Sequence, residues 1–167
     1  MYGIIVREMK NGSFANMKDI FDVLGSTRQY NWLLSEYECI NYPSEKIPYF
    51  MEYGGYVWLT GDEFVDIVTE HVYWFIWGIA AAYTKDIILE EVLKYPIVDA
   101  QEYAGYYELP IPMQNPLAEI EIYPIDSSFL IITSKSQDVI TKFAKECTDS
   151  EDLAEYNRKR ILQTGDE

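Results

Sequence analysis

The chain has 167 residues, enough for one domain, and combines a formal net charge of −15 with 15 tyrosines and 4 tryptophans. Because 49% of it is hydrophobic, it has the side chains that a core needs, which excludes a disordered acidic tail. The excess of acids argues against nucleic acids and anionic membranes as partners and favours a basic partner. No linker divides residues 1–167, so we expect a single domain, with residues 164–167 frayed.

The first elements follow from hydrophobic spacing. Residues 2–7 are β-branched and aromatic and predict a strand. Apolar residues then recur at helical spacing over 14–24, with Ser13 as the expected N-cap and Gly25 at the expected stop. This part of the chain reads as a strand followed by an amphipathic helix.

The next stretch predicts short strands. Residues 30–34 and 37–40 are expected to form two strands joined by a turn between them. Residues 49–53 and 56–59 flank Gly54-Gly55, which is a hairpin signal.

The middle of the chain carries a capping box, with Thr60 at the cap and Glu63 three residues later, which predicts the start of a helix. The apolar run 72–83 is about twelve residues long, short of the ~20 that a membrane helix needs, and we expect a strand buried on both faces. Asp86 is placed to cap a further helix over 87–94.

Residues 97–116 predict a long connection, which in a compact domain is often functional. Residues 118–123 alternate between apolar and polar types, predicting a strand with one buried and one wet face. After a turn, 129–133 returns as a strand, Ser134 caps the next helix, and 150–162 forms a short final helix. These elements predict an α+β fold: a mostly antiparallel sheet of about six strands with three to four helices packed on one face.

The sequence offers little for catalysis. The one histidine, His71, shares a helical face with Phe64 and Val68, as a partly buried structural histidine does. Cys39 and Cys147 are far apart and have no metal-type spacing, which predicts two reduced thiols and no disulfide. The start of the chain has no basic leader or long apolar segment, so we expect a cytoplasmic protein. Because no catalytic, metal-ligand or phosphate-binding pattern is found, we also expect that it is not an enzyme and binds no metal or cofactor.

Two alternatives stay open. Asp62, Asp66 and Glu70 recur every four residues on one helical face, which favours a solvated face over a metal site. His71 with Asp66 or Glu70 in a pocket would make a small-molecule-binding or hydrolytic domain. A structural or regulatory protein is the third reading.

Tyrosines beside acids are the most distinctive pattern, because tyrosine is enriched in interface cores and acids steer basic partners. The tyrosines of the long connection are the least explained by core packing, because loops rarely build cores. We therefore expect a non-enzymatic protein that captures a basic protein partner, although exposed aromatic loops also fit a homodimer. The expected contact residues are Glu36, Tyr37, Glu38, Glu102, Tyr103, Tyr106, Tyr107 and Glu108.

Most of the chain resembles a family of small uncharacterised proteins of Gram-positive bacteria, known only as a domain of unknown function. The resemblance lies in Tyr30-Asn31-Trp32, the capping-box helix, the buried run 72–83 and the closing elements over 119–147. It implies an α+β fold without naming an activity.

In character the chain is similar to immunity proteins, which neutralise toxins in bacterial competition. Tyr106-Tyr107, followed by Glu108 and Pro110, resembles the paired tyrosines beside acids of nuclease-colicin immunity proteins. Those proteins are four-helix bundles, so the resemblance implies a partner class, a basic toxin, and not a fold.

Overall fold

A computed structural model describes residues 1–13, 15–42 and 55–164. In these residues the strands are β1 (Tyr2–Met9), β2 (Tyr30–Tyr42), β3 (Tyr56–Thr60), β4 (Val72–Thr84), β5 (Ile120–Ile125), β6 (Phe129–Ser134) and β7 (Cys147–Asp152). The helices are α1 (Met17–Leu24), α2 (Gly61–Glu70), α3 (Leu89–Val92), α4 (Gln137–Glu146) and α5 (Leu153–Thr164), with 3-10 turns η1 (Thr27–Gln29) and η2 (Gly105–Tyr107).

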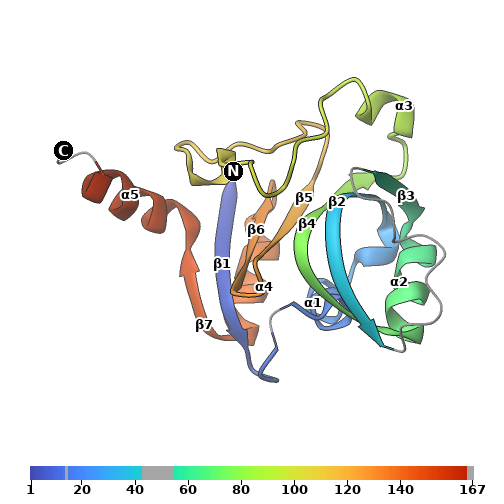
Figure 1. Cartoon of the computed structure of the whole chain (residues 1–167), viewed down its shortest axis with the longest axis horizontal. Helices are drawn as coiled ribbons and strands as arrows, with labels where there is room; N and C mark the ends of the chain where they lie inside the picture. The colour runs from blue at the N-terminus through green and yellow to red at the C-terminus, as the bar shows by residue number, and fades with distance from the viewer. Residues whose placement is uncertain (14, 43–54, 165–167) are drawn as a thin grey trace.

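The strands form one antiparallel sheet in the order β3-β2-β4-β5-β6-β1-β7 (Figure 1). The predicted α+β fold with a mostly antiparallel sheet is confirmed. The sheet has one strand more than expected, β7.

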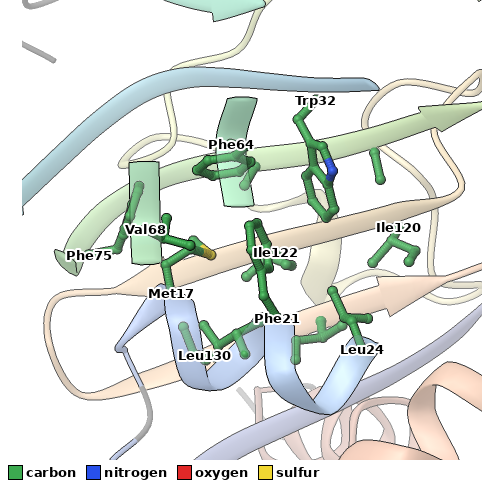
Figure 2. Close-up of a cluster of buried hydrophobic side chains, with 14 of the residues drawn as sticks. Met17, Phe21, Leu24, Trp32, Phe64, Val68, Phe75, Ile120, Ile122 and Leu130 are labelled. Carbon is green, nitrogen blue, oxygen red and sulfur yellow. The ribbon is translucent and has the colours of Figure 1, made fainter. Parts of the chain in front are cut away.

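Helices α1, α2 and α4 cover one face of the sheet and bury the first core. Figure 2 shows Met17, Phe21 and Leu24 of α1 directed at side chains of the sheet and of α2. Helix α1 ends at Gly25 as expected, with the glycine in the left-handed conformation (φ 67°). Its N-cap is Asn16 and not Ser13.

The capping box of α2 is confirmed. Thr60 N donates to Glu63 Oε2 at 2.8 Å, and Glu63 N donates to Thr60 Oγ1 at 3.3 Å. The backbone N and the hydroxyl of Thr60 both donate to the Glu63 carboxylate and hold the pKa of Glu63 below its usual range, because they favour the charged form. The stability that the capping box adds is therefore fully present above the pKa that Glu63 has in the unfolded chain. It is lost as the pH falls through the lower pKa that Glu63 has in the folded protein.

Strand β2 is continuous where two short strands were expected. Its pairing with β4 shifts register between Ser35 and Cys39, and Glu36 has a positive φ of 47°, so the predicted turn is a bulge within one strand. Strand β3 pairs with the first half of β2. The expected strand 49–53 and Gly54 lie outside the described residues.

The second face of the sheet is also covered, and this corrects two expectations. Residues of the connection between β4 and β5 and of helix α5 pack there and bury a second core. Helices therefore lie on both faces, and β5 is buried on both sides and not wet on one. The helix expected over 87–94 is only one turn long, and Asp86 hydrogen-bonds Thr84 and does not cap it.

The C-terminal part differs in its boundaries. Residues expected to begin a final helix at 150 pair with β1 as β7, and α5 starts at Leu153. Helix α4 has Ser136 at its N-cap, while Ser134 accepts a hydrogen bond from Ser136 N at 3.0 Å. None of the helices in the described ranges is long and apolar enough to cross a bilayer.

Candidate functional site

The tyrosines of the connection point inward. Tyr106 is 5% exposed, and its ring lies 5.5 Å from that of Tyr103, 4.5 Å from that of Tyr107 and 5.3 Å from that of Tyr123 on β5. All four belong to the second core, so the premise that these loop rings lie outside any core is wrong. The connection forms no long helix, and its own side chains cover the second face of the sheet. For this reason its tyrosines become part of a core.

Burial also sets the chemistry of these rings. It raises the pKa of Tyr103 and of Tyr106 to about 12, so both phenols stay protonated at neutral pH. Arg160 of α5 lies 4.4 Å from the centre of the Tyr107 ring. The three rings thus act as internal packing that fixes the connection on the sheet.

Tyr37, the other expected anchor, belongs to the opposite side of the sheet. It is partly buried against the first core, with its ring 6.2 Å from that of Phe75. Glu38 beside it is exposed, and Glu36 is partly exposed at the bulge. The sheet lies between Tyr37 and Tyr106, so the eight expected contact residues do not form one surface.

Three of the exposed apolar side chains of the connection lie at or near α3, and a fourth, Leu109, lies beyond η2. Ile88 is 54% exposed, Leu93 38% and Tyr95 37%. Acidic side chains stand around Ile88 and before Leu93, while the exposed Lys85 and Lys94 stand beside Asp86 and between Leu93 and Tyr95. The apolar and acidic residues form what we call the α3 surface: Asp86, Ile88, Glu90, Glu91, Leu93 and Tyr95. The α3 surface lies at the start of the connection (Figure 1). Glu102 and Glu108, which are also exposed, come later in the connection.

The acids of this region differ from several acids of α2 and β7 in forming no ion pairs within the described residues. Residues 85–108 contain six acids and two lysines, and none of the six acids forms an ion pair with another described residue. By contrast, Arg28 pairs with both Asp62 and Asp66 at 2.9 Å, and Arg7 pairs with Asp149 and Glu151 of β7. The connection therefore carries negative charge that the fold itself does not neutralise.

One residue that sequence analysis did not single out organises the connection. Glu121 on β5 is fully buried and accepts hydrogen bonds from Gln114 N, Asn115 N and the Tyr123 hydroxyl. Burial raises its pKa, while these hydrogen bonds and the charge of Lys135 act in the opposite direction. The apolar–polar alternation of β5 gave no signal of this, because an exposed glutamate produces the same pattern.

His71 lies at the C-terminal end of α2 beside a hollow of about 280 Å³. Asn16, Lys18, Val68, Thr69, Glu70 and Val72 line it with His71. The His71 Nδ1 atom is buried without a hydrogen-bond partner among the described residues, and Asp66 is bound to Arg28. Nowhere in the described ranges do three His, Cys, Asp or Glu side chains gather as a metal site would require.

Comparison of the chain with protein-family models, with curated proteins and with solved structures finds no match in any of the three. The two resemblances given above remain predictions.

Proposed function

We propose that this protein is a non-enzymatic acidic binding protein that captures a basic protein partner in the cytoplasm, in the manner of an immunity-type toxin inhibitor. The observation that carries the proposal is the α3 surface, where exposed apolar side chains stand among carboxylates without ion-pair partners. Large apolar side chains that are buried at an interface contribute much of the binding energy. Carboxylates around them attract a cationic partner and speed association.

The connection would contribute along its length. Glu102 and Glu108 are exposed and extend the negative surface beyond α3. The tyrosines beside them support the surface from beneath, since their rings pack in the second core. The contact proposed here therefore differs from the tyrosine-anchored one that the sequence indicated.

Charge reversal on α3 tests the proposal against candidate basic toxins. With a toxin that binds, Glu90→Lys with Glu91→Lys is expected to raise Kd by about tenfold or more and to flatten its salt dependence, because steering charges are replaced by repulsive ones. The matched control, Asp138→Lys with Glu146→Lys on α4, changes the net charge equally on the opposite side of the sheet. It should change Kd by less than about threefold.

Binding would be measured by titration calorimetry across a salt series. Equal effects of the two double variants would remove the α3 surface as the contact. Affinity that does not respond to salt, or the lack of any basic toxin that binds, would count against the proposed function as a whole.

A second candidate function, a small-molecule-binding or hydrolytic site, is favoured by the hollow beside His71 and Glu70. Because His71 is the single histidine of the chain, His71→Ala removes every imidazole-dependent activity at once. Hydrolysis of p-nitrophenyl acetate is the probe: a loss of about tenfold or more in rate with His71→Ala, and a smaller loss with Glu70→Gln, is expected of this candidate. Unchanged hydrolysis by His71→Ala would leave a hydrolytic role without support.

A further inference from the structure

We infer that the buried carboxylate of Glu121 positions the α3 surface, through Gln114 and Asn115, from the centre of the sheet. The proposed function explains what this surface is for, whereas the positioning itself follows from a chain of hydrogen bonds. Its links join the sheet to the connection, and the end of the connection to α3 and to Pro96 just beyond α3.

The first link fixes Glu121 to the connection. Gln114 N donates to Glu121 Oε2 at 2.9 Å, and Asn115 N donates to Oε1 at 2.8 Å. Both carboxylate oxygens are thereby used by consecutive backbone amides, and the Tyr123 hydroxyl donates to Oε2 as well. A carboxylate suits this task because it presents two acceptor oxygens, whereas a glutamine amide presents one.

The second link runs from the connection to α3. The Asn115 side chain donates from Nδ2 to the carbonyl of Val92, the last residue of α3, at 3.2 Å. The Gln114 side chain donates from Nε2 to the Pro96 carbonyl at 2.7 Å. These two bonds hold the chain on either side of Leu93 and Tyr95, the exposed apolar residues of the α3 surface.

Helix α3 needs such support. It is four residues long, no described side chain caps its N-terminus, and a single helical turn is not stable on its own in water. Val92 is its one fully buried side chain. Its position therefore depends on the packing of Val92 and the partly buried Leu89 in the second core and on the hydrogen bond from Asn115. Asn31 and Gln114 hold the chain just before and just beyond it, at the carbonyls of Ile87 and Pro96.

The anchor itself is rigid. Glu121 stands opposite Ala81 of β4 and Thr133 of β6, so it is held between two neighbouring strands. It lies in the fully buried part of β5. Buried charges of this kind are costly unless hydrogen-bonded, and the energetic penalty for an incomplete set of bonds makes the arrangement specific.

Amide hydrogen exchange tests the positioning without any partner. In Glu121→Gln, one of the two backbone amides loses its acceptor, so the connection should open more often. We expect the amides of Val92, Leu93 and Tyr95 to exchange about tenfold faster or more than in the wild type. Amides of α2 and α4, which open independently on the first core, should change by less than about threefold.

Two further variants complete the test. Glu119→Gln removes a partly exposed carboxylate just before β5 that bonds Lys135 and neither Gln114 nor Asn115, and it should leave α3 exchange unchanged. Gln114→Met removes only the bond to Pro96 and should produce a smaller acceleration at Tyr95; it serves also if Glu121→Gln does not fold. Wild-type exchange at α3 in both Glu121→Gln and Gln114→Met, or equal acceleration in α2 and α4, would overturn the inference.

The exchange result and the charge-reversal result are independent. Faster α3 exchange in Glu121→Gln establishes the positioning role even if charge reversal on α3 leaves toxin binding unchanged. In that case the proposed function would fail while this inference stood.

Discussion

Phe64→Ala is expected to lower the free energy of unfolding by about 3–5 kcal/mol, among the largest effects of any single substitution in this chain. Phe64 is fully buried on α2, and its ring meets that of Phe21 edge-on at 4.7 Å and that of Trp32 at 5.6 Å (Figure 2). Alanine would remove the ring that joins α1, α2 and β2. The resulting cavity cannot close, because the sheet on one side and two helices on the other are fixed.

Urea unfolding followed by tryptophan fluorescence measures this effect. Phe64→Leu keeps most of the volume and should cost clearly less than the alanine variant. Leu162→Ala is the control, since Leu162 is 73% exposed, and it should change stability by less than about 0.5 kcal/mol. A loss below about 1 kcal/mol for Phe64→Ala would mean that the first core is not packed as described.

The first core could be predicted because its signals are local. The apolar spacing of α1, the Thr60 and Glu63 capping box and the apolar run of β4 each follow from a short stretch of chain. Helices α1 and α2 then bury the side that their pattern indicates, but β4 is buried on both faces only from Gly78 to Tyr83, because Val72 and Trp74 in its first half are 40% exposed. Local propensity and tertiary packing agree in the two helices, which is what makes a sequence readable.

The second core could not be predicted, because it is built by a segment with no repeating pattern. Tyr103, Tyr106 and Tyr107 occupy a connection, and only its course along the sheet decides that their rings face inward. Glu121 is the counterpart on the sheet. The alternation of apolar and polar residues along β5 predicts that Glu121 is exposed. The backbone amides that bind its carboxylate belong to Gln114 and Asn115, in a segment with no regular structure.

Strand β7 was missed for a different reason. After Cys147, its five residues are polar or acidic, so they have no apolar pattern, and the strand forms by backbone pairing with β1. Arg7 on β1 pairs with Glu151 at 3.2 Å, a contact between residues far apart in the sequence. Edge strands are commonly protected by such charges, which also hide them from pattern analysis.

The candidate site could be predicted only in its charge. The composition predicts an acidic surface but not its position on the fold. Glu102 and Glu108, two of the expected contact residues, are exposed. Which apolar residues accompany the acids depends on which side chains the fold leaves exposed. Ile88, Leu93 and Tyr95 remain exposed because the expected helix over 87–94 is only one turn long and buries Val92 in place of a full face.

Gly61→Ala is expected to destabilise the protein by about 3 kcal/mol, opposite in sign to what helix propensity predicts. Gly61 is the first residue of α2, where alanine is normally the better helix former. A Cβ atom there would lie 2.6 Å from the carbonyl oxygen of Tyr30 and 2.7 Å from the Cα of Arg28, and it would also collide with the carbonyl oxygen of Thr27. All three obstacles are backbone atoms, so no rotation of a side chain can relieve them.

The collision would push α2 away from η1. This movement would also break the two ion pairs that Arg28 of η1 forms with Asp62 and Asp66 of α2. Thermal and urea unfolding of Gly61→Ala beside Thr69→Ala, an exposed position of the same helix, measures the cost. Thr69→Ala should be neutral or slightly stabilising, since alanine has the higher helix propensity and no contact is lost. If Gly61→Ala were as stable as the wild type, α2 could not lie as closely against η1 as the structure has it. The packing of residues 27–30 against the start of α2 would then be wrong.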